Sequence, residues 1–232
     1  MTILAFDASS RTASAALYRA GALIGESFQN SGLTHSQTLM PMIQSLLENT
    51  QTDPKTVGLV AVTRGPGSFT GLRIGVSTAA GLAWGWGVPC CGVSALEAAA
   101  LGASHMGGLV CPVMDARRGQ VYNALFQAEN GTLARLTPDR ALSAADLWAE
   151  IQKKAPVLVG DGAELCYNLR GDNPARLPPV PLRHPSAWAV AVLAEQAAAR
   201  GETCPPDKLT PIYLRLPQAE RERIDRESGT QT

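Results

Sequence analysis

A glycine-rich loop between an apolar run and a helical pattern is the part of this sequence best suited to binding a charged ligand. The loop reads Arg64-Gly65-Pro66-Gly67-Ser68, between the strand-like residues 57–63 and the helical residues 70–86. Free backbone amides and the positive end of a helix together bind phosphates and other anions. The sequence therefore predicts an anion or nucleotide contact, or alternatively a tight turn with no ligand. The residues concerned are Arg64, Gly67 and Ser68.

Two aspartates form a second candidate site. Asp7 and Asp115 each follow a short apolar strand, where α/β sheets present ligands and metal-binding carboxylates. Together they could flank a nucleotide and its magnesium ion, with Arg118 as a further contact to the anion. Neither aspartate is followed directly by a glycine that would let the backbone approach a phosphate. The alternative is the commoner one, in which each carboxylate accepts hydrogen bonds from amides of its own turn.

The other reactive side chains argue against several classes of enzyme. His35, His105 and His184 are far apart and lack the spacing of a zinc protease. No serine lies in a nucleophile elbow. The five cysteines include no CxxC pair, so we expect buried, free thiols without a catalytic or metal-binding role.

Composition and charge indicate an ordinary folded protein. The 232 residues are 45% hydrophobic, and 20 basic side chains balance 20 acidic ones. This balance gives no overall reason to hold nucleic acid. There is no signal-peptide pattern at the N-terminus and no apolar run of the roughly 18 residues that a membrane span needs. We therefore expect a cytoplasmic protein that does not contact membranes.

Hydrophobic periodicity predicts an α/β protein whose first part has the element order βββαβαβα. A later part continues with two helices and a strand between turns rich in glycine and proline. The expected strands are 3–6, 13–18, 22–28, 57–63, 89–93 and 156–160, and the expected helices are 34–48, 70–86, 94–100, 143–154 and 186–200.

An internal echo at an offset of 108 residues suggests that the chain contains a duplication. Asp7-Ala8 matches Asp115-Ala116, and Ala16-Leu17 matches Ala124-Leu125. In both copies an apolar strand runs into Asp-Ala, a short polar turn follows, and a second strand returns, ending near Tyr18 or near Phe126. The pattern predicts two domains and a flexible, charged tail, at residues 1–104, 105–216 and 217–232.

The helix predicted over residues 70–86 is unusual because it is apolar on two sides. One stripe runs from Leu72 to Trp86 and the opposite one from Ile74 to Gly85. Glycine costs about 1 kcal/mol relative to alanine inside a helix, so several of them suggest that something packs close to the backbone. That partner is either the protein's own sheet or another chain. The glycines are Gly71, Gly75, Gly81 and Gly85.

Several segments of the sequence form one recognisable pattern. They are ILAFDASSRTASAAL, HSQTLMP, GPGSFTGLRIGVSTAAGLAWG, MDARRGQVY and PIYLRLPQAE. Together they resemble the bacterial TsaB family of proteins for tRNA threonylcarbamoyladenosine biosynthesis, and the match covers residues 1 to about 220. The resemblance implies a duplicated and reduced pair of ribonuclease-H-like domains of the actin-like ATPase superfamily.

The resemblance also implies that this chain is not itself an enzyme. In the catalytic paralogue TsaD, the corresponding segment reads Asn-His-Leu-Glu-Gly-His, and its two histidines bind the catalytic metal. The similar segment here begins at Ser94 and places Ala95 and Ala99 at the histidine positions. A methyl group offers no lone pair, so we expect no metal site. We also expect no cofactor bound by this chain alone, with ATP and magnesium used by the wider complex.

The partners implied by the resemblance are TsaD and the ATPase TsaE, with tRNA contacted indirectly through the complex. We expect the two helices of the first domain to bind TsaD, so that a bulky residue at Gly75 or Gly81 of the second helix abolishes pairing, while the question of which face meets the partner stays open. We expect the isolated chain to bury the same surface in a homodimer. The predicted interface residues are His35, Leu39, Met42, Ile43, Leu46, Leu72, Gly75, Val76, Ala79 and Ala83.

Three other functions compete with this interpretation. An autonomous small-molecule kinase or ATPase would use Asp7 and Asp115 around magnesium and ATP. A protease is disfavoured by the missing histidines. A tRNA-binding module gains little support from a net charge of zero, although arginines near the C-terminus leave a minor contact open. These arginines are Arg215, Arg221, Arg223 and Arg226.

Overall fold

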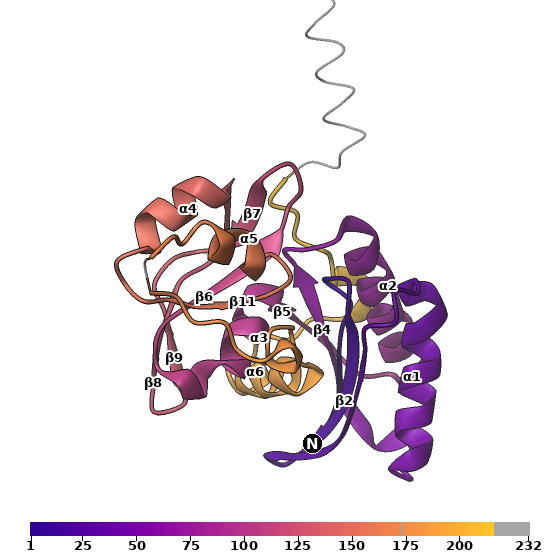
Figure 1. The fold of residues 1–232 in the computed structure, drawn as a ribbon. Coiled ribbons are helices and arrows are strands. Elements are labelled where there is room, and N and C mark those ends of the chain that lie inside the picture. Colours follow the sequence, from indigo (N-terminus) through magenta and orange to yellow (C-terminus); the bar gives the residue numbers. More distant parts are fainter. Residues whose placement is uncertain (173, 216–232) are drawn as a thin grey trace, which may run out of the picture.

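A computed structural model describes residues 1–172 and 174–215 and shows two β-sheets with helices between and beside them (Figure 1). The first sheet has the strand order β3-β2-β1-β4-β5. Strand β2 runs antiparallel to both of its neighbours, β1 and β3, whereas β1, β4 and β5 run parallel to one another. The strands are β1 (Thr2–Asp7), β2 (Ala13–Arg19), β3 (Ala22–Gln29), β4 (Val57–Gly65) and β5 (Cys90–Ser94).

Two helices cover one face of the first sheet, α1 (His35–Asn49) and α2 (Phe69–Trp86) (Figure 1). Helix α1 begins with a capping box between Thr34 and Gln37 and contains Pro41 as its seventh residue, where the helix lacks one backbone hydrogen bond. Helix α2 ends at Gly87, which adopts the left-handed conformation that favours glycine. The predicted boundaries of these helices are therefore accurate to within one residue.

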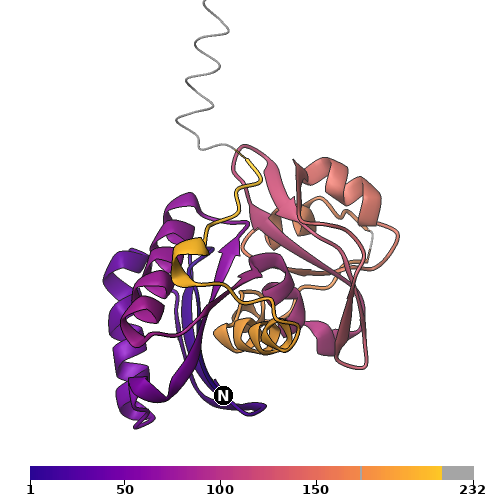
Figure 2. The same ribbon diagram turned by 180° about the vertical axis from the view of Figure 1, so that it is seen from behind.

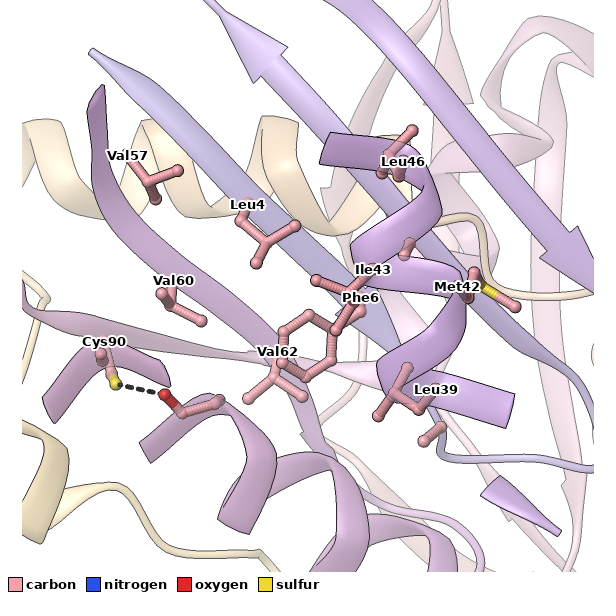
Figure 3. Close-up of a cluster of buried hydrophobic side chains, with 14 of the residues drawn as sticks. Leu4, Phe6, Leu39, Met42, Ile43, Leu46, Val57, Val60, Val62 and Cys90 are labelled. Carbon is pink, nitrogen blue, oxygen red and sulfur yellow. Dashed lines mark hydrogen bonds between the residues drawn. The ribbon is translucent and has the colours of Figure 1, made fainter. Parts of the chain in front are cut away.

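The core between these helices and the sheet is built from alternate strand residues and from one stripe of each helix (Figure 3). Leu4, Phe6 and Val62 point from the sheet toward Leu39 and Ile43 of α1. Side chains of a strand alternate between its two faces, so Ile3 and Ala5 belong to a separate cluster on the opposite face. The first sheet is thus buried on both sides.

A layer of two helices lies between the two sheets (Figure 1). Helix α6 (Ala187–Ala199) packs on the first sheet, where Tyr18 donates a hydrogen bond to Glu195. Helix α3 (Ala95–Gly102) has Ser94 as its N-cap, as predicted, and packs on the second sheet. Because α6 covers the first sheet from a later part of the chain, its contacts cross the predicted boundary at residue 105, and this division stays a prediction.

The second sheet repeats the central pairing of the first. Strand β6 pairs antiparallel with β7 and parallel with β11, as β1 pairs with β2 and β4. The path through the sheet is β10-β7-β6-β8-β9, with β11 on β6. The strands are β6 (Gly108–Asp115), β7 (Gln120–Asn123), β8 (Phe126–Glu129), β9 (Thr132–Arg135), β10 (Arg140–Ser143) and β11 (Val157–Val159).

The remaining helical segments are short. The hydrophobic residues of the two α-helices among them form a cluster with β6 and β7 in the second half. The α-helices of this set are α4 (Ala144–Ile151) and α5 (Ala163–Asn168), and the 3₁₀ turns are η1 (Pro54–Thr56), η2 (Ser104–Met106), η3 (Val180–Leu182) and η4 (Pro206–Lys208).

One predicted strand differs from the structure. The returning strand of the second half was expected to end near Phe126, but β7 already ends at Asn123 and Phe126 begins β8. Between them, Leu125 donates its amide to Thr137 and accepts from Leu136, so these backbone groups leave the ladder. The matched pair Ala124-Leu125 therefore has no strand role like that of Ala16-Leu17.

The last described segment, residues 203–215, runs back across both halves (Figure 2). The amide of Ile212 donates to the carbonyl of Arg64 at 2.7 Å, and Arg215 donates from its guanidinium to the carbonyl of Ala116 at 3.2 Å. The segment thus joins the end of β4 to the turn after β6. The predicted tail, residues 217–232, lies outside the described residues, as do Arg221, Arg223 and Arg226.

None of the helices within residues 1–172 and 174–215 is both long enough and apolar enough to span a bilayer.

Candidate functional site

Asp7 lies at the end of β1 and organises the turn that follows it. Its Oδ1 accepts hydrogen bonds from the amide and hydroxyl of Ser9, at 3.1 and 2.6 Å, and from the hydroxyl of Thr63 at 2.5 Å. The bond from the amide of Ser9, two residues ahead, defines an Asx turn. The bond from Thr63 connects this turn to the end of β4. The alternative prediction, an aspartate that orders its own turn, is confirmed here.

Burial makes the charge of Asp7 costly. The residue is fully buried, and Oδ2 has no hydrogen-bond partner among the described residues. Desolvation raises the pKa of Asp7, and the hydrogen bonds from Ser9 and Thr63 and the nearby His35 only partly offset this. A carboxyl group whose pKa is raised by burial, and one of whose oxygens already accepts three hydrogen bonds, is a poor ligand for a magnesium ion.

The glycine-rich loop is packed against the turn after Asp7. A side chain at Gly67 would collide with the carbonyl of Ser9, and one at Gly71 would collide with the carbonyl of Ala8. The amide of Ser68 donates to the carbonyl of Ser9 at 2.7 Å, while its hydroxyl caps α2 by accepting from the amide of Gly71. These contacts account for the glycines and for the cap residue, as the alternative of a tight turn expected.

Arg64 is directed away from this turn. Its aliphatic stem lies across Gly92 of β5, where a Cβ would come within 2.5 Å of Arg64 Cδ and 3.1 Å of Leu209. Its positive charge lowers the pKa values of Cys91 and Cys204, which desolvation raises. The predicted set of anion contacts is therefore divided, because Arg64 belongs to the β5 side whereas Gly67 and Ser68 belong to the Asp7 side.

Asp115 repeats the geometry of Asp7 in a more exposed turn. Its Oδ1 accepts from the amide of Arg117 at 2.7 Å, and its Oδ2 lies 3.3 Å from the guanidinium of Arg117. Arg117 and Arg118 both have positive φ angles, 67° and 55°, which non-glycine residues rarely adopt. The turn thus presents two arginines to solvent on a strained backbone.

The structure adds Asp161, which sequence reasoning treated only as a turn residue. Its Oδ1 accepts from the amide of Asp115 at 3.1 Å. Desolvation raises the pKa of Asp161, and the negative charges of Asp115 and Asp7 raise it further. The three aspartates therefore lie near one another where β1, β6 and β11 end. The sequence signal that could have found Asp161 is the Asp-Gly pair directly after β11. Parallel neighbours such as β11 and β6 end at the same edge of a sheet, so residues that follow them lie close together.

Within residues 1–172 and 174–215, no group of three or more His, Cys, Asp or Glu side chains is arranged to hold a metal ion. Ala95 and Ala99 lie in the apolar cluster between α3 and the second sheet, with Met114 and Phe126. Glu97, between them in sequence, forms an ion pair of 2.6 Å with Arg135. The segment that resembles the TsaD metal motif is thus used for packing between α3 and the second sheet.

The predicted partner interface needs a correction. Nine of its ten residues have buried side chains or backbone in the core between the helices and the first sheet. The remaining residue, His35, is half-buried, and its Nε2 lies 2.8 Å from the carbonyl of Ser10. Because these groups are already covered by the chain itself, they are not accessible to a partner. The nine are Leu39, Met42, Ile43, Leu46, Leu72, Gly75, Val76, Ala79 and Ala83.

The opposite side of α2 is accessible, and we call it the outer face of α2. It consists of exposed Gly81, Trp84 and Gly85, and it is flanked by Ile74 and Leu82, which are half-buried against the core cluster. Trp84 is 73% exposed, and a Cβ added at Gly81 or Gly85 would meet no atom within 4 Å. The four glycines of this helix thus divide into two that face the core and two beside which the space is open.

Comparisons with known proteins first define the class of this fold. The model of the TsaD family, described as tRNA N6-adenosine threonylcarbamoyltransferase, matches residues 29–171. The solved structure of YeaZ from Pseudomonas aeruginosa is similar with a TM-score of 0.78 and 29% identity, covering 92% of this chain and 99% of that chain. The chain therefore shares its α/β fold, two sheets with helices between and beside them, with this solved structure.

Two relatives narrow this class to one family. The chain is 37% identical to TsaB of Bacillus subtilis (strain 168), over 97% of this chain and 99% of the relative. It is 34% identical to TsaB of Escherichia coli (strain K12), over 93% of this chain and 95% of the relative. Both relatives are described as tRNA threonylcarbamoyladenosine biosynthesis proteins. The chain belongs to the TsaB family, as the resemblance predicted.

Proposed function

We propose that this chain is a non-catalytic subunit of the cytoplasmic complex that forms N6-threonylcarbamoyladenosine next to the anticodon of tRNAs that read codons starting with A. In this role it binds and activates the catalytic subunit TsaD, together with the ATPase TsaE. The names of its relatives support the pathway. The match to the TsaD family model supports descent of this subunit and its partner from one fold.

The observation that carries the proposed role is the outer face of α2. Two glycines one helical turn apart, Gly81 and Gly85, leave the backbone of α2 open to solvent, beside the exposed indole of Trp84. Exposed glycines cost helix stability and contribute nothing to the core. Small residues let a second helix approach closely, and aromatic anchors dominate many protein interfaces. This surface is suited to a helix of TsaD.

The contacts around Asp7 support an accessory rather than a catalytic role. The loop glycines Gly67 and Gly71 are packed against the chain's own carbonyl groups, those of Ser9 and Ala8. Asp7 is fully buried, and desolvation raises its pKa. These residues do not fit a phosphate and its magnesium ion. Calorimetry of the isolated chain with ATP and magnesium should give no binding heat, and saturable binding would support the kinase alternative.

The test of the partner surface is a pair of variants with one charge placed on different helices. Gly81→Arg should weaken binding of the TsaD homologue at least about 30-fold, because a charged side chain fills the open space beside α2. Ala149→Arg places the same side chain on the exposed side of α4 and should leave the affinity unchanged. Binding is measured by calorimetry, and tRNA threonylcarbamoylation by the reconstituted proteins is the second readout.

Thermal unfolding of both variants controls for folding. A Gly81→Arg chain that melts like the native one and still binds TsaD with native affinity contradicts the proposed surface. The same face would be buried in the homodimer that we propose for the isolated chain. Light scattering should then show that TsaD and self-association compete, whereas a ternary assembly of one TsaD on an intact homodimer through separate faces contradicts a shared surface.

A further inference from the structure

Cys90 and Cys204 face each other directly in a short antiparallel bridge. The amide of Cys90 donates to the carbonyl of Cys204 at 2.8 Å, and the amide of Cys204 donates to the carbonyl of Cys90 at 2.9 Å. Residues that exchange both hydrogen bonds in this way have Cα atoms about 5.5 Å apart. That separation lies within the range found in disulfides, which is about 4.4–6.8 Å.

The two side chains also lie on the same face of the sheet. Both cysteines belong to the apolar cluster beneath α2, where Cys90 Sγ lies 3.8 Å from the carbonyl of Ala79 (Figure 3). The adjacent Cys91 belongs to the cluster on the opposite face, with the residues of α6. Alternation along β5 therefore selects Cys90, not Cys91, as the partner of Cys204.

The two thiols differ in accessibility. Cys90 is fully buried, whereas Cys204 is half-buried. Cys204 also lines a surface cavity of about 420 Å³ at the C-terminal end of α2, together with Trp84, Pro89 and Pro205. A small molecule in this cavity therefore meets Cys204, whereas Cys90 is fully buried and does not line the cavity.

We propose that Cys90 and Cys204 are a disulfide-forming pair that is oxidised by small disulfides of the glutathione class entering this cavity. The bond would fix residues 203–215 covalently to β5. That segment already joins the two halves of the molecule through Ile212 and Arg215. The bond thus locks the connection between the two halves when the thiol pool becomes oxidising.

The oxidation proceeds in two exchange steps. The Cys204 thiolate attacks one sulfur of the small disulfide, so that a mixed disulfide forms and one small thiolate leaves. The Cys90 thiolate then attacks Cys204 Sγ, the bond between Cys90 and Cys204 forms, and the second small thiolate leaves. The two protons of the protein thiols end on the two small thiols. The protein loses two electrons and the small disulfide gains them.

The surroundings of the thiols make the exchange slow at neutral pH. Burial raises the pKa of Cys90 to about 12 and raises the pKa of Cys204, while Arg64 lowers that of Cys204 and Asp207 raises it. Near Cys91 the charged groups are Arg64, Arg200 and Glu202. Thiolates are the attacking species, so the rate should rise about tenfold for each pH unit between pH 7 and 8.

The test incubates the full, folded chain with oxidised glutathione and counts its free thiols. The native chain should lose two of its five thiols, and Cys91→Ser should lose the same two. Cys90→Ser should stop at glutathione bound to Cys204, and Cys204→Ser should keep its remaining thiols. The oxidised native chain should melt about 5–10 °C higher than the reduced chain, because a long loop has been closed.

Three results would overturn the proposal. One is that the native chain keeps all five thiols in oxidised glutathione at pH 8 while circular dichroism shows it folded. Another is that the linkage forms in Cys90→Ser and is lost in Cys91→Ser, because Cys91 would then be the partner. A linkage that forms only in urea also contradicts it, since the pairing would depend on unfolding and not on the native bridge.

Discussion

The two faces of helix α2 carry similar residues but meet different surroundings. On the inner face, a side chain at Gly71 would collide with the carbonyl of Ala8, and one at Gly75 would come within 3.3 Å of Val62. On the outer face, the positions beside Gly81 and Gly85 are open. Glycine is thus required by the chain's own packing on one face and not on the other.

This difference distinguishes glycines of α2 that the fold requires from glycines that the fold does not require. The inner glycines let α2 approach the turn after Asp7, where the amide of Ser68 donates to the carbonyl of Ser9. The outer glycines weaken the helix without any gain in the core. Gly81 and Gly85 thus lower the stability of the isolated helix without improving its packing on the core. We infer that packing against a partner compensates for this loss, and the proposed TsaD surface rests on that inference.

The largest expected effect comes from adding one methyl group to the inner face. Gly71→Ala places a Cβ against the backbone carbonyl of Ala8, which can move only if the whole turn moves. We expect a loss of about 3 kcal/mol in the free energy of unfolding. Urea unfolding measures it. A loss below about 0.5 kcal/mol would mean that the turn yields, and the contrast between the faces would fail.

The second prediction concerns Asp7, which orders the turn that packs against the inner face of α2. Because desolvation raises its pKa in the folded state, its contribution to stability is complete below the unfolded pKa, near 3.8, and is lost as the pH rises through the folded pKa. The difference in unfolding free energy between the native chain and Asp7→Asn should therefore shift in favour of the variant as the pH rises from about 4 to about 7. Urea unfolding at several pH values measures it, and a shift of the opposite sign contradicts the burial argument.

The smallest effect is the same methyl group on the outer face, where its sign should reverse. Gly81→Ala meets no atom within 4 Å and should stabilise the isolated chain by about 0.5–1 kcal/mol. Gly71→Ala serves as the matched comparison, measured by the same urea unfolding. Destabilisation by Gly81→Ala would show that the outer face also packs against the chain itself.

The elements of the first half could be predicted from the sequence because their patterns are local. Helix α2 was predicted at residues 70–86 and lies at Phe69–Trp86, and Ser94 caps α3 as expected. The return strand of the second half was misjudged, because nothing local shows that Leu125 pairs with Leu136 and Thr137. Such pairings depend on strands that come later in the chain.

The candidate site was harder to predict because it depends on the directions in which side chains point, which residue types alone do not reveal. Both faces of α2 are apolar, so periodicity could not tell that Leu72 and Val76 face the sheet. Arg64 adjoins the glycine-rich loop in sequence, yet its side chain lies across Gly92. Asp161 joins Asp7 and Asp115 only through the parallel pairing of β11 with β6.

Photo-crosslinking from position 84 tests the proposed TsaD surface most directly. A photoreactive phenylalanine replaces Trp84 on the outer face, or Leu165 on α5 as a control that is also exposed. The account predicts a covalent product with the TsaD homologue from position 84 and none from position 165. Crosslinking from position 165 without any from position 84, in a complex that still forms, would contradict it.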